Sequence, residues 1–88
     1  MNAHAFENAL ELYRLAGEAA IQAEETYRRA FAAAILASKG GNAEARKADA
    51  ETATSNERLA RDRAALEREI ARHMVEYLKV AAGKDVAA

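Results

Sequence analysis

The tetrapeptide Lys39-Gly40-Gly41-Asn42 constrains this chain more than any other feature, because it separates two long helix-forming segments. Proline is absent, alanine is the commonest residue, and most of the remainder favours helices. Gly40 or Gly41 can take the left-handed conformation that closes a helix, and Asn42 is a good N-cap for the next helix. A connection this short returns the second helix antiparallel to the first.

The sequence therefore predicts an all-α fold, an antiparallel two-helix hairpin in a single domain that covers residues 1–88. Helix 1 is expected over residues 3–38, the turn over 39–42, helix 2 over 43–82, and a frayed tail over 83–88, after Gly83. The alternative for helix 2 is a break near Thr54, because Thr54 and Glu57 have the spacing of a capping box.

Helix 1 carries an aromatic stripe beside an alanine stripe, and the run from Ala30 to Ala37 is apolar on every side. One partner helix cannot cover so wide an arc, so we expect hairpins to assemble into a helical bundle. The partner is a second copy, as a dimer or higher homo-oligomer, or another protein, placed against Ile35 or Leu36. The predicted interface consists of Phe6, Leu10, Tyr13, Tyr27, Phe31, Ile35 and Leu36.

Helix 2 has a heptad-like stripe that we expect to face helix 1. It runs from Ala45 to Val80, and its large members are Leu59, Leu66, Ile70, His73 or Met74, Tyr77 and Val80. With the turn at Gly40 and Gly41, facing residues should have numbers that sum to about 81, from the geometry of an antiparallel pair. This register predicts three ion pairs between the helices, which are Arg14–Glu67, Glu18–Arg63 and Glu24–Arg58.

Nothing in the sequence predicts catalysis, a cofactor or a metal site. The chain has no cysteine, and neither of its serine residues has the context of a nucleophile. In a helical-bundle metal site a carboxylate precedes the histidine by three residues, but Ile70 holds that position before His73. The predicted function is therefore that of a non-enzymatic helical interaction module.

A cluster of basic residues near the turn supports a different function. Between Thr26 and Ala48 the only acid is Glu44, and the formal net charge of the whole chain is −1. Such a basic tip could contact phosphates, although a salt-bridged surface has the same composition. The alternative is a nucleic-acid-binding accessory protein in recombination or replication, with contacts from Arg28, Arg29, Lys39, Arg46 and Lys47.

The segment KGGNAEARKADAETAT, within residues 27–78, resembles small alanine-rich helical-hairpin accessory proteins of bacteriophage genomes. The resemblance implies a phage accessory or host-interaction protein that acts on DNA transactions or on a host protein. The WXG-type hairpins differ, because this turn has no tryptophan. The longest apolar run, from Ala30 to Ala37, is far below the roughly 20 residues of a membrane span. We therefore expect a cytoplasmic protein, in a bacterial cell or in the host cytoplasm if phage-encoded.

Overall fold

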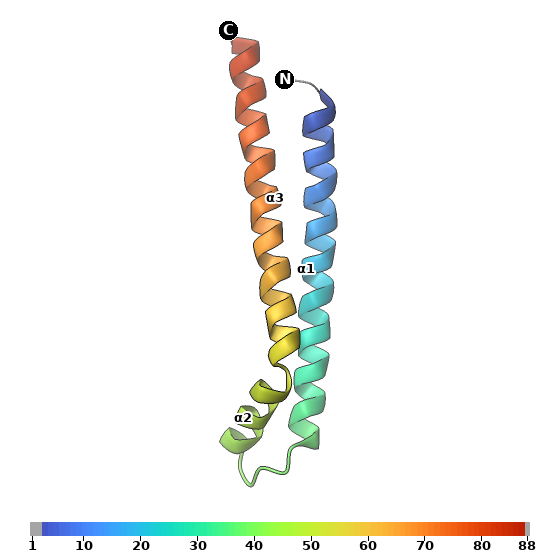
Figure 1. The fold of residues 1–88 in the computed structure, drawn as a ribbon, viewed down its shortest axis with the longest axis vertical. Coiled ribbons are helices and arrows are strands. Elements are labelled where there is room, and N and C mark those ends of the chain that lie inside the picture. The colour runs from blue at the N-terminus through green and yellow to red at the C-terminus, as the bar shows by residue number, and fades with distance from the viewer. Residues whose placement is uncertain (1–2, 88) are drawn as a thin grey trace.

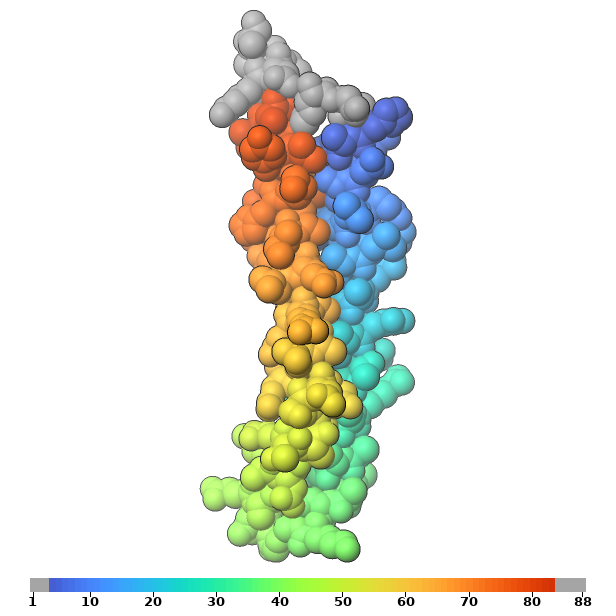
Figure 2. All heavy atoms as spheres, in the orientation of Figure 1, coloured from blue at the N-terminus to red at the C-terminus, as the bar shows by residue number. Residues whose placement is uncertain are grey.

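The computed structural model describes residues 3–87, which form an extended helical hairpin. Helix α1 (Ala3–Ala37) is followed by the short helix α2 (Ala43–Ala53) and then by α3 (Ser55–Ala87). Helices α1 and α3 lie side by side and antiparallel, while α2 leans away at the turn (Figure 1). The molecule measures 67 × 17 × 14 Å, and side chains of the two long helices meet along the rod (Figure 2). The predicted all-α antiparallel hairpin is confirmed.

The turn begins and ends with local hydrogen bonds. The Ser38 amide donates to the Ile35 carbonyl at 3.3 Å, and Asn42 Oδ1 accepts from the Ala45 amide at 2.8 Å, which confirms the predicted N-cap. No described glycine has a positive φ, so the predicted left-handed glycine is wrong. Gly40 is required for a different reason: a Cβ there would lie 2.9 Å from both Ala45 Cβ and the Arg46 amide nitrogen.

The second helical segment breaks at Thr54, as the alternative predicted. Thr54 Oγ1 donates to the Ala50 carbonyl at 2.6 Å, and the Thr54 amide donates to the same oxygen at 3.0 Å. A hydroxyl that bonds back to the preceding turn bends a helix, and Thr54 has φ −110° and ψ 21°. The Thr54–Glu57 capping box does not form, because the Thr54 hydroxyl donates backward instead of accepting from the next turn.

The far end of this segment also differs from the prediction. Helix α3 continues through Gly83 to Ala87, where the sequence predicted a frayed tail over 83–88. One helical glycine costs only about 1 kcal/mol relative to alanine, so Gly83 alone does not end the helix. Residue 88 lies outside the described residues.

The most deeply buried residues of the hairpin are small. The most deeply buried residues are Ala9, Ala50 and Thr54, and Ala64 and Ala71 of α3 are half-buried at the same contact. Small residues let two helix backbones approach closely, and Val75 and Leu78 of α3 are half-buried as well, whereas most of the larger apolar side chains of α3 are exposed. The predicted inward stripe of the second segment is therefore wrong: its exposed members are Leu59, Leu66, Ile70, Met74, Tyr77 and Val80.

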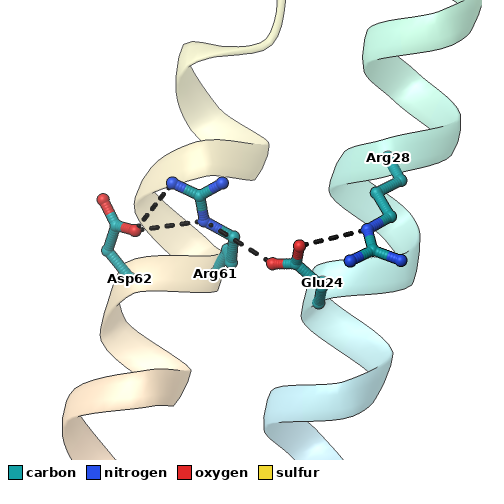
Figure 3. A network of polar contacts seen from close by, with 4 residues as sticks. All are labelled: Glu24, Arg28, Arg61 and Asp62. Carbon is teal, nitrogen blue, oxygen red and sulfur yellow. Dashed lines mark hydrogen bonds and ion pairs between the residues drawn. The ribbon is translucent and has the colours of Figure 1, made fainter.

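A small polar network links α1 to α3 across the seam (Figure 3). Glu24 contacts Arg28 at 3.2 Å on its own helix and Arg61 at 3.8 Å on α3, and Arg61 also contacts Asp62 at 3.1 Å. None of the three predicted ion pairs forms among the described residues. Glu24 meets Arg61, almost one turn beyond the predicted Arg58, because the break at Thr54 and the loop shift the register.

Candidate interaction surface

The seven residues predicted to form an interface divide into two groups. Phe6, Tyr13, Tyr27, Phe31 and Ile35 are half-buried at the seam of the hairpin, whereas Leu10 and Leu36 are exposed, Leu36 with 87% of its surface accessible. The aromatic stripe of α1 thus packs mainly within its own chain.

Tyr27 shows how the chain uses this stripe. Its ring centroid lies 5.8 Å from that of Phe31, and the guanidinium carbon of Arg61 lies 4.3 Å from the Tyr27 ring centroid. A cation over an aromatic face is attractive, and the pair joins α1 to α3. These contacts stabilise the hairpin itself.

A different set of large apolar residues remains open on one side of the hairpin. We call it the apolar face, and it consists of Leu12, Leu15, Leu59, Leu66, Ile70, Met74 and Tyr77, all of them exposed. The α3 members are spaced by three, four or seven residues, so they follow one strip of the helix. Leu12 joins the strip because it lines one groove with Ile70 and Met74. The sequence identified the α3 strip but wrongly predicted that it faces α1.

Two grooves run along this side. The first, of about 230 Å³, lies between α1 and α3 and is lined by Ala9, Leu12, Glu67, Ile70, Ala71 and Met74. The second lies nearer the turn, measures about 490 Å³, and is lined by Ala19, Gln22, Ala23, Thr26, Asn56, Glu57 and Ala60. The first groove therefore has large apolar walls, and the second has mostly small ones.

The opposite side of the hairpin, which we call the charged face, carries most of the paired charges. A groove there is lined by Ala20, Ile21, Glu24, Glu25, Arg28, Arg61, Ala65 and Arg68. Farther along the same side, Arg72 contacts Glu69 at 2.7 Å and Glu76 at 2.8 Å. The hydrogen bonds that Arg72 donates lower the pKa of Glu69, and those of Arg14 lower the pKa of Glu11.

Two charged residues lie on the apolar face instead. Arg63 precedes Ile70 by one heptad, and Glu67 lines the groove with Ile70. None of the ion pairs formed by the described side chains includes Arg63 or Glu67. An opposite-charge couple one turn apart on α3 therefore lies among the large apolar residues of this face.

The five residues of the predicted basic tip do not form one uniform cluster. Arg28 contacts Glu24 at 3.2 Å and Arg29 contacts Glu25 at 3.6 Å, so carboxylates partly neutralise both. Arg46 Nε donates to the Gly40 carbonyl at 3.2 Å. In the described part of the chain, Lys39, Arg46 and Lys47 have no carboxylate partner.

The described residues contain neither a metal-binding cluster nor a membrane-spanning helix. No group of three or more histidine, cysteine, aspartate or glutamate side chains is placed to hold a metal ion. His73 lies 4.0 Å from Glu69 and 3.9 Å from Glu76, and all three side chains are exposed on one helix. No helix among residues 3–87 is long and apolar enough to cross a membrane.

Comparison with known proteins places this chain in no family. No family model, no curated protein and no solved structure matches it. The resemblance to phage accessory proteins therefore stays a prediction.

Proposed function

We propose that this chain is a non-enzymatic helical interaction module that self-associates into a helical bundle through the apolar face. The observation that carries the proposal is the strip of large exposed apolar side chains along α3, with Leu12 of α1 beside it. A two-helix hairpin has no second layer to cover such a strip, and helices with one apolar side are stable when that side is buried.

The total surface supports the same proposal. The chain exposes 6622 Å², about 1,600 Å² more than the area expected of a compact 9.5 kDa monomer. A stable protein interface removes about 800 Å² from each partner. The excess area is therefore large enough to accommodate a full interface.

A matched pair of isoleucine substitutions tests the proposal. Ile70 lies on the apolar face and Ile21 on the charged face, with 58% and 66% of their surfaces exposed. Light scattering of the wild-type protein at micromolar concentration is expected to give a multiple of the chain mass. Ile70→Glu should give the monomer mass, and Ile21→Glu should leave the assembly intact.

A fully helical wild-type monomer across this concentration range would refute self-association, and equal effects of the two substitutions would refute the apolar face as its interface. An amphipathic helix of another protein would fit the same strip, because helix-in-groove binding uses apolar anchors at this spacing. A phage or host partner rests on the sequence resemblance alone.

A second candidate function, binding of nucleic acid at the tip, rests on Lys39, Arg46 and Lys47, which have no carboxylate partner among the described residues. Phosphate contacts would make binding weaken steeply with salt. Lys47→Glu should then reduce binding to duplex DNA or single-stranded RNA at low salt. Lys79→Glu, at the other end of the rod, is the control, and equal effects of the two changes would contradict a tip site.

A further inference from the structure

We propose that the occupant of the apolar face is a second copy of this chain, docked face to face and antiparallel. The two-fold axis crosses the rod between Arg63 and Glu67, so that α3 packs on the partner's α3 and the two hairpin turns point to opposite ends. This inference rests on the proposed self-association and adds the orientation and the residues that set it.

The charges on the apolar face support this orientation. Arg63 and Glu67 have opposite signs, lie one turn apart, and have no ion-pair partner among the described residues. An antiparallel neighbour related by this axis brings Arg63 against Glu67 of the other copy and Glu67 against its Arg63. Both ion pairs then form at once, which matters because an unpaired charge in an interface is costly.

The grooves agree with the same axis. In this register the residue numbers of facing α3 positions sum to about 130, from the antiparallel geometry. Ile70 and Met74 therefore meet the positions around Ala60 and Asn56 of the other copy. The groove with large apolar walls is placed over the groove whose apolar residues are all alanines, lined by Ala19, Ala23 and Ala60 together with Gln22, Thr26, Asn56 and Glu57.

The area that this dimer would bury is also sufficient for a stable interface. The axis lies near the middle of the rod, so nearly all of the 35 residues of α1 overlap with the other copy. That length is about 50 Å, and with a rod width of 17 Å it gives a footprint of roughly 900 Å² per copy. This exceeds the roughly 800 Å² that each partner contributes to a stable interface.

The competing arrangement has the two-fold axis parallel to the rod, with both turns at the same end. It places α3 over the partner's α1, where the surface near this level is formed by Ala19, Gln22 and Ala23. These three groove residues are uncharged and offer Arg63 and Glu67 no ion pair. The antiparallel arrangement is favoured because it pairs both.

Charge reversals test the pairing. Arg63→Glu makes both positions acidic and Glu67→Arg makes both basic, so each variant alone should dimerise about tenfold or more weakly than wild type. An equimolar mixture of the two should dimerise again, because each acidic position then faces a basic one. Arg68→Glu, on the charged face of the same helix, should leave dimerisation unchanged within a factor of two. Sedimentation equilibrium gives each dissociation constant.

The position of the turns gives an independent readout. The chain has no cysteine, and a side chain at Gly41 would have open space, so Gly41→Cys can carry a single label. The antiparallel dimer separates two labels by roughly 60–70 Å at 1.5 Å per helical residue. Turns at the same end would place them within about 25 Å, at neighbouring-helix spacings of 8–10 Å.

The outcomes separate the two proposals. Weak dimers of the single variants, recovery in the mixture and distant labels support the antiparallel dimer. A wild-type dimer without recovery in the mixture, or with adjacent labels, overturns this inference and leaves self-association standing. A wild-type monomer removes both.

Discussion

Arg61 makes both a cation–π contact and an ion pair from α3 to α1, so its removal should lower the free energy of unfolding. Its guanidinium lies 4.3 Å from the Tyr27 ring centroid and 3.8 Å from Glu24, and its side chain is 30% exposed. A partly exposed cation–π contact is worth about 0.5–1 kcal/mol, and an exposed ion pair about 0.5 kcal/mol. Arg61→Ala should therefore lower the free energy of unfolding by about 1–1.5 kcal/mol.

Urea unfolding followed by circular dichroism measures this change, at one fixed protein concentration because association adds to apparent stability. Arg58 forms no ion pair with the described side chains, so Arg58→Ala is the control and should cost about 0.5 kcal/mol or less. A double-mutant cycle with Tyr27→Leu should give a coupling of about 0.5–1 kcal/mol. A coupling below about 0.3 kcal/mol, or equal losses at Arg58 and Arg61, would refute this account of the seam.

Four further predictions concern stability. Gly40→Ala should lower the unfolding midpoint, because its Cβ would lie 2.9 Å from neighbouring atoms. Gly41→Ala is the control, because a Cβ at Gly41 would have no atom within 4 Å. Asn42→Ala should cost about 1 kcal/mol in urea unfolding through loss of the α2 N-cap. Glu57→Leu should be neutral or stabilising in the same assay, because Glu57 Oε2 is buried without a hydrogen-bond partner. The lowered pKa values of Glu11 and Glu69 stabilise the fold above the ordinary value of 4.5, so helicity in a pH titration should fall as pH drops through their lower folded values.

Fold class and chain reversal could be predicted from the sequence because strong local signals determine them. A proline-free, alanine-rich chain interrupted by Lys39-Gly40-Gly41-Asn42 has little alternative to a helical hairpin, and Asn42 caps α2 as expected. The sequence also predicted the break at Thr54 as an alternative, because the residues around this threonine are weak helix formers.

The direction of the α3 strip could not be predicted, for a physical reason. The usual rule assigns large apolar residues such as Ile70 to the contact, but here Ile70 is exposed and the half-buried residues of α3 include Ala64, Ala71, Val75 and Leu78. Helical periodicity identifies a strip but not what covers it, and the bend at Thr54 changes its phase relative to α1. The predicted register failed for the same reason, so Glu24 meets Arg61 instead of Arg58.

Small-angle X-ray scattering tests the central claim most directly, because it reports mass and shape together. The single hairpin has a radius of gyration of 19.4 Å and a mass of 9.5 kDa. Two hairpins stacked through the apolar face at a helix spacing of 8–10 Å should double the mass and keep the radius of gyration at about 20 Å. A single-chain mass at several hundred micromolar, or a doubled mass with a much larger radius from end-to-end contact, would contradict the claim.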